Sequence, residues 1–330
     1  RINLSAAPVT VTGEAVTARD GTLLSAKFDS FKVSPGDDLH VEISRGEGNI
    51  FKTAVRGSAI DLRPYVKSFM AGAQTDTQDA DLELKAASAI GFGNEKGTEL
   101  DLRMSRRGQG LTDFRFGGRV GHARVSGRLN REGRPLITIE TQDAGAFLRF
   151  VDLYRHMNSG IMVLRLTPSV GSQAGAVSIR DFSLRNEEAL GRIFAAAPPP
   201  RAASDASSAH VAPLQAGEAQ FNRMQASFVR NAGRLDIKEA LIVGNQAGIT
   251  VSGLLDFANN SQSLSGTFVP AYGLNNVFSK VPLFGPLLGG GSNEGLLGVN
   301  FRVVGSLSEP QVSVNPLSAI APGFLRKLFD

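Results

Sequence analysis

The run Leu297-Gly-Val-Asn-Phe-Arg-Val303 decides the fold class, because apolar and polar or small residues alternate along it without interruption. In an extended chain, successive side chains point to opposite faces, so Leu297, Val299, Phe301 and Val303 share one face. This period of two predicts a β-strand with one apolar face.

The same alternation recurs through the rest of the chain, in short runs separated by polar or glycine-containing turns. Leu39, Val41 and Ile43 share a face in one run, and Leu100 and Leu102 share a face in another. Turn signals come about every 8 to 12 residues, which is typical of an all-β protein. We therefore expect a mostly β fold. It would be a large curved antiparallel sheet, shaped as a groove or taco or closed as a sandwich, with a few short amphipathic helices at its ends.

Helical spacing of apolar residues predicts three helices, near 61–71, 144–157 and 187–197. Pro64 suits the first turn of the first helix, and Asp143 is suited to cap the N-terminus of the second. Residues 1–197 are thus expected to be a β-rich sheet that carries all three helices.

Residues 198–213 are rich in Ala, Pro and Ser and nearly free of bulky apolar residues. Such a composition is typical of a linker. The strand pattern resumes in residues 214–330, so 198–213 either separates two domains or is a loop that leaves one continuous sheet.

Within 214–330, residues 272–288 are predicted to form a helical plug, which glycines and prolines interrupt. Residues 321–330 form a short basic amphipathic tail. Two interpretations of both segments stay open: contact with a membrane, or a cap over the edge of the sheet.

Composition excludes several classes of chemistry. The 330 residues contain no Cys and no Trp, and the formal net charge of +4 comes without long basic runs. Disulfides, thiol nucleophiles and a nucleic-acid partner are therefore not expected. The absence of Trp also counts against a carbohydrate-active protein.

No sequence motif supports catalysis. The chain has no nucleophile elbow, and its histidines have no acidic or Cys neighbour at metal-ligand spacing. The glycine-containing run 91–98 lies between two predicted strands, which indicates a hairpin turn rather than a phosphate-binding loop. We expect neither an enzyme nor a metal or cofactor.

Two blocks of sequence resemble a known family. One runs through LNNVFSKVPLFGPLLGGG, GLLGVNFRVVGSLSEPQVSVNP and LSAIAPGFLRKLF between 274 and 329. The other runs through DAGAFLRFVDLY, GIMVLRL and GAVSIRDFSLRN between 143 and 186. Together they resemble the C-terminal region of the AsmA-like family of bacterial envelope proteins, near its YhdP branch, which are bridge-like lipid transfer proteins. Asn158-Ser159-Gly160 departs from the pair of glycines expected at that turn.

The resemblance implies a non-enzymatic protein of the Gram-negative envelope. Its apolar β-groove would bind and conduct phospholipid between the inner and outer membranes. It would lie in the periplasm, anchored to the inner membrane by a segment preceding Arg1, with phospholipid, a membrane surface and other envelope proteins as partners. The alternative is a structural envelope scaffold that assists outer-membrane assembly and has a closed β-sandwich interior.

Under the first interpretation, the candidates for the lipid groove are the apolar residues that alternate along the strands. These are Phe114, Phe116, Val125, Leu129, Leu164, Leu166, Val251, Leu297, Val299, Phe301 and Val303. The candidates for membrane contact lie in the plug and the tail. These are Val277, Phe278, Leu283, Phe284, Leu287, Leu288, Phe324, Leu325, Leu328 and Phe329.

Overall fold

The computed structural model confirms a mostly β protein. It describes residues 2–6, 8–72, 78–108, 110–169, 171–196, 217–245, 247–270 and 299–315. Of these residues, 66% lie in β-strands, which form an open curved sheet with only three α-helices. The predicted linker 198–213, the plug 272–288 and the tail 321–330 lie outside the described residues.

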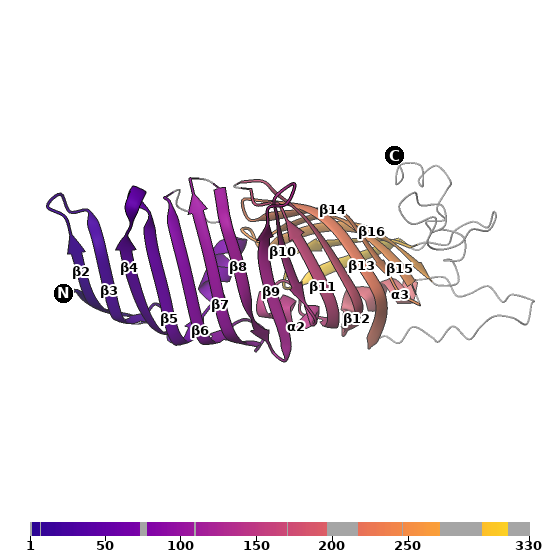
Figure 1. Ribbon diagram of the computed structural model, residues 1–330. Helices are drawn as coiled ribbons and strands as arrows, with labels where there is room; N and C mark the ends of the chain where they lie inside the picture. Colours follow the sequence, from indigo (N-terminus) through magenta and orange to yellow (C-terminus); the bar gives the residue numbers. More distant parts are fainter. Residues whose placement is uncertain are drawn as a thin grey trace, which may run out of the picture. The chain divides into compact units, whose positions relative to one another are not determined.

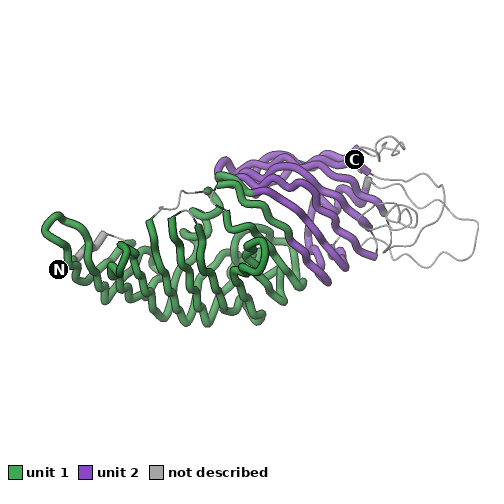
Figure 2. The backbone as a smooth tube through the Cα atoms, turned by 45° about the horizontal axis from the view of Figure 1, so that its top comes forward, with its two compact units in different colours: residues 1–176, 230–233 green, residues 177–229, 234–330 purple. Residues whose placement is uncertain are grey.

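The chain divides into two compact units (Figure 2). Unit 1 comprises residues 1–176 and 230–233, and unit 2 comprises 177–229 and 234–330. The first elements of unit 1 are β1 (Ile2–Ala6), β2 (Val9–Thr17), β3 (Leu23–Lys32), β4 (Asp38–Arg45), a 3₁₀ turn (Glu47–Asn49), β5 (Phe51–Asp61) and α1 (Arg63–Met70). They are followed by β6 (Ala80–Ile90), β7 (Lys96–Arg107), β8 (Gly110–Val120), β9 (Ala123–Asn130), β10 (Leu136–Thr141), α2 (Ala144–Phe150) and β11 (Met157–Leu166).

The strands β1 to β11 stand side by side in chain order (Figure 1). Nine of the ten pairings are antiparallel, as expected for short connections. The exception is β5 with β6, which are parallel, with Phe51 opposite Ala80 and Asp61 opposite Ile90. The reason is the crossover through α1, which returns the chain to the end of the sheet where β5 began.

Unit 2 holds most of β12 (Gln173–Arg185) and of β13 (Glu218–Asn231), with α3 (Glu188–Ala196) between them. It also holds β14 (Arg234–Val243), β15 (Ala247–Asp256), β16 (Ser261–Pro270), β17 (Val299–Gly305) and β18 (Pro310–Asn315). The strands β14 to β18 pair in chain order, and every one of these pairings is antiparallel. The predicted strand through Val299, Phe301 and Val303 is β17.

The helices α1 and α3 lie within the predicted ranges, but the prediction for α2 is too long. The Asp143 cap is present, since Ala146 N donates to Asp143 Oδ1 at 2.9 Å. The helix ends at Phe150 instead of residue 157, and Asp152 takes a left-handed φ of 53°. The cause is tight packing of α2 on the start of β11, where a Cβ on Gly145 would lie 2.4 Å from the Met157 carbonyl oxygen.

Candidate functional site: the apolar face of the sheet

In unit 1, one row of side chains crosses eleven strands on the same face of the sheet. Residues directly opposite each other on paired strands share a face, so the register gives the row without ambiguity. Every member is apolar or glycine: Ile2, Gly13, Phe28, Val41, Val55, Leu84, Leu102, Phe116, Gly127, Ile139 and Leu164. The row forms a continuous apolar track across the unit, from β1 to β11.

A second row on the same face lies two residues further along each strand. It runs through Ala15, Ala26, Ile43, Thr53, Leu82, Met104 and Phe114, and the last three strands continue it with Leu129, Ile137 and Leu166. The apolar track is therefore at least two residues wide.

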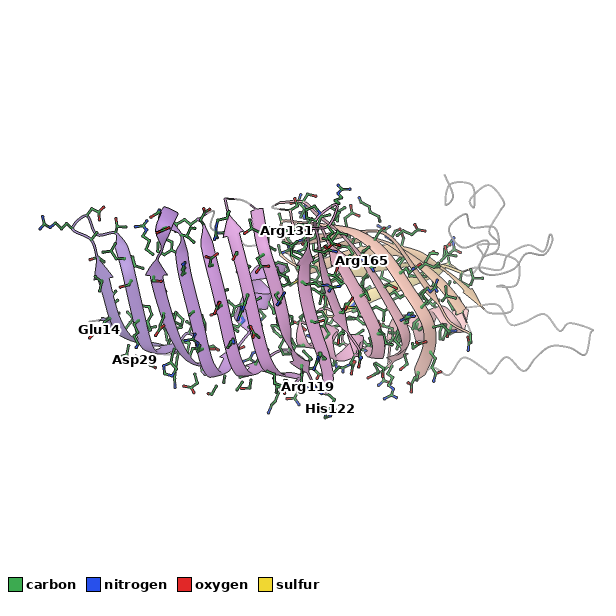
Figure 3. The ribbon with its side chains drawn as sticks, in the orientation of Figure 1. Glu14, Asp29, Arg119, His122, Arg131 and Arg165 are labelled. Carbon is green, nitrogen blue, oxygen red and sulfur yellow. The ribbon has the colours of Figure 1, made fainter. Side chains whose placement is uncertain are left out.

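The opposite face of the same strands carries charge. The row directly between the two apolar rows comprises Glu14, Lys27, Glu42, Ala54, Glu83, Arg103, Arg115, Arg128, Thr138 and Arg165. Figure 3 labels Glu14 and Arg165, the first and last members of this row. The sheet of unit 1 thus has one apolar face and one charged face that is exposed to solvent.

Helix α2 covers only part of the apolar face. The Phe150 ring is 6% exposed and lies over two glycines, since a Cβ on Gly91 would lie 2.2 Å from the ring and one on Gly97 3.4 Å. Phe150 belongs to a buried cluster with Val120 and Val125. Near α2 the face is therefore filled by the protein itself.

The predicted groove residues of unit 1 differ in how deeply they are buried. Val125 is fully buried in the cluster that includes Phe150. The other five are only partly buried, although they stand on the same apolar face: Phe114, Phe116, Leu129, Leu164 and Leu166. The described part of unit 1 contains no second sheet over these side chains, although Phe116 also packs against the buried cluster of Phe150.

The predicted groove residues of unit 2 are more enclosed. Val299, Phe301 and Val303 are at most 8% exposed, whereas Val251 is partly buried. From α3, Phe194 places its ring 5.1 Å from that of Phe268, which pairs with Val299. The Phe301 ring lies over Gly266, where a Cβ would be 2.4 Å from it.

The remaining predicted residues lie outside the described part of the chain. They are Leu297 and all ten membrane-contact candidates: Val277, Phe278, Leu283, Phe284, Leu287, Leu288, Phe324, Leu325, Leu328 and Phe329.

Sequence reasoning missed a buried carboxylate at the end of β5. Asp61, whose side chain is 2% exposed, accepts two bonds from the Arg63 guanidinium at 2.7 and 2.9 Å and one from Ser34 Oγ at 2.6 Å. Its own backbone N–H donates to Asp37 Oδ1 at 2.8 Å. This network joins the β3–β4 loop to the start of α1. The only sequence signal for it was an Asp just before a helix.

The hydrogen bonds from Arg63, with a further contribution from Ser34, lower the pKa of Asp61 from its ordinary 3.8 to about 2, against the opposing effect of burial. Because the pKa is lower in the folded protein, Asp61 stabilises the fold above pH 4, and this contribution disappears as the pH falls from about 4 to about 2. We expect it to be about 2 kcal/mol. Urea unfolding at several pH values between 5 and 2 measures this change in the free energy of unfolding. An Asp61→Asn variant should lose the part of the pH dependence that Asp61 contributes.

The described residues hold no group of three or more acidic or His side chains that could bind a metal ion. None of the described helices has the length and apolarity needed to cross a membrane. Comparison of the chain with models of protein families, with curated proteins and with solved structures finds no match.

Proposed function

We propose that this chain is a non-enzymatic protein of the Gram-negative envelope, whose apolar sheet face binds phospholipid acyl chains and conducts them between the inner and outer membranes. The observation that carries the proposal is the apolar row across eleven strands, which no second sheet covers in the described part of unit 1. Val41 and Leu84 of this row are buried, whereas its other side chains are at least partly exposed. A contiguous apolar surface that stays exposed usually marks an interaction site. The resemblance to the AsmA-like family is the second support.

The chemistry of the face suits acyl chains. Each buried methylene contributes about 0.8 kcal/mol, so an apolar row holds a long hydrocarbon chain without any specific polar contact. Successive strands are about 4.8 Å apart and present similar side chains, so a chain can shift by one strand with little change in free energy. Such a face binds acyl chains strongly and still allows them to slide from strand to strand.

The alternative is a scaffold with a filled interior. The burial of Phe268, Val299 and Phe301 near α3 favours it for unit 2, because those side chains pack against the protein's own residues. The partial exposure of Phe114 and Phe116 favours the lipid face for unit 1.

Native mass spectrometry of protein purified without detergent tests the proposal. The informative variant is Phe116→Asp, which places a charge in the middle of the apolar row. The matched control is Arg115→Asp, the neighbouring position on the opposite face. We expect wild type and Arg115→Asp to carry phospholipid, and Phe116→Asp to carry at least about tenfold less, since an unpaired carboxylate is costly among acyl chains.

Circular dichroism must show that Phe116→Asp is folded. A wild type that carries no lipid, even after incubation with phospholipid vesicles, would overturn the proposal in favour of the scaffold. So would equal lipid in Phe116→Asp and Arg115→Asp.

A further inference from the structure

A cleft of about 700 Å³ lies in unit 1, where α1 faces the turn between β6 and β7. Helix α1 contributes Arg63, Pro64 and Lys67. The chain from Ile90 to Lys96 forms the other side, and Asp61 contributes to the lining from the end of β5. The wall is thus part apolar and part charged.

The turn itself is a tight hairpin. Gly93 and Asn94 have φ values of 60° and 61°, and Glu95 N donates to the Phe92 carbonyl oxygen at 3.0 Å. Two left-handed central residues are the pattern of a type I′ turn, which favours Gly and Asn. The turn therefore holds Phe92 and Lys96 in fixed places beside α1.

The carboxylates of the cleft are already neutralised. Asp61 is bound by both arms of the Arg63 guanidinium, and Glu95 Oε1 lies 2.8 Å from Arg149 Nε of α2. Lys67 and Lys96 have no carboxylate within ion-pair distance among the described residues, and the Lys67 ammonium lies 5.5 Å from the centre of the Phe92 ring. With Arg149 counted as the partner of Glu95, the cleft has an excess of two positive charges.

We propose that this cleft binds a phosphate group through Lys67 and Lys96, and that the phosphate is that of a phospholipid headgroup. This inference rests on the proposed function, because the acyl chains of such a lipid would lie on the apolar face. A lysine ammonium attracts phosphate as a point charge and imposes no fixed geometry. The one guanidinium that lines the cleft, Arg63, is held in a bidentate pair by Asp61.

The position of the cleft suits a headgroup. Ile60, Ala89, Gly97 and Val120 form an apolar row at this end of the strands. Ile90, the residue after Ala89, lines the cleft. Phe150 covers this end of the row. A phosphate at Lys67 and Lys96 would therefore lie at the rim, and the chains of the same lipid would lie on the part of the apolar face that α2 leaves uncovered.

The test uses the full chain and the double variant Lys67→Glu/Lys96→Glu. Its control is Arg115→Glu/Arg128→Glu, which makes the same change in net charge on the opposite face, where the two arginines pair across β8 and β9. Each protein is incubated with vesicles that contain phosphatidylglycerol or diacylglycerol, and bound lipid is counted by native mass spectrometry. Binding of inorganic phosphate is measured separately by ³¹P NMR titration.

We expect the cleft variant to bind phosphatidylglycerol about tenfold less than the control does, which corresponds to the loss of two charge interactions. Diacylglycerol, which has the chains but no phosphate, should bind all three proteins alike. That combination supports the headgroup site.

Other outcomes separate the two proposals. If the wild type binds no lipid but binds inorganic phosphate, and the cleft variant loses the phosphate, then the cleft is a site for free phosphate and the lipid function is overturned. If the wild type binds both lipids and the cleft variant binds phosphatidylglycerol as the control does, the headgroup site is overturned while the lipid function stands. If neither lipid nor phosphate binds, both proposals are overturned.

Discussion

Replacement of Phe150 by alanine should lower the free energy of unfolding of unit 1 by about 4 kcal/mol. Truncation of a buried Phe removes its transfer free energy and leaves a cavity, which together cost about 3 to 5 kcal/mol. Phe150 is 6% exposed, lies over Gly91 and Gly97, and belongs with Ala146 to the residues through which α2 covers the apolar face. Urea unfolding followed by circular dichroism measures the loss.

A double-mutant cycle with Gly91 makes this prediction specific. In the wild type, Gly91→Ala should destabilise by about 1 to 3 kcal/mol, because the added Cβ would lie 2.2 Å from the Phe150 ring. In the Phe150→Ala background, the same change should cost almost nothing, since the ring is gone. Additive effects of the two substitutions would show that Phe150 does not lie over Gly91.

Replacement of Asp61 by alanine should lower the free energy of unfolding by about 3 kcal/mol. The carboxylate accepts bonds from Arg63 and Ser34, and hydrogen bonds to charged groups contribute about 1.5 to 3 kcal/mol each. This loss of stability lies near the lower end of the range for removing one partner of a buried ion pair. The reason is that the Arg63 side chain is 46% exposed and can be hydrated when Asp61 is absent.

Asp38→Ala is the control for Asp61→Ala. Asp38 lies on the neighbouring strand, but it is exposed and accepts a hydrogen bond from Ser58 Oγ. Its removal should change the free energy of unfolding by less than about 0.5 kcal/mol. A similar loss for the two variants would show that Asp61 is not the centre of a buried network.

Much of the fold could be predicted from local patterns. Leu100 with Leu102, and Phe114 with Phe116, alternate with polar residues, and all four lie on the predicted apolar face. The hairpin turn within residues 91–98 and the cap at Asp143 were also predicted and are present. Each of these features depends on residues within a few positions of one another, which is why a single sequence reveals it.

Features that depend on distant residues could not be predicted. The antiparallel sheet was expected, but the parallel pairing of β5 with β6 depends on where the crossover through α1 returns the chain. The end of α2 at Phe150 follows from contact with β11, although the apolar stripe continues to Met157. The excess positive charge of the cleft at Lys67 and Lys96 depends on Arg149, which lies 54 residues after Glu95 and neutralises it.

The sequence by itself determined that the protein is built from strands with one apolar and one polar face, because the parity of side chains along a strand is a local property. Only the tertiary structure decided that these faces align across eleven strands in one row, since alignment depends on the register between strands. It also decided which apolar residues stay partly exposed, as Phe116 does, and which are fully buried, as Val125 is. The physical reason is that burial depends on the elements that pack over a residue, and the position of α2 is set by its contacts with β11 and the β6–β7 turn.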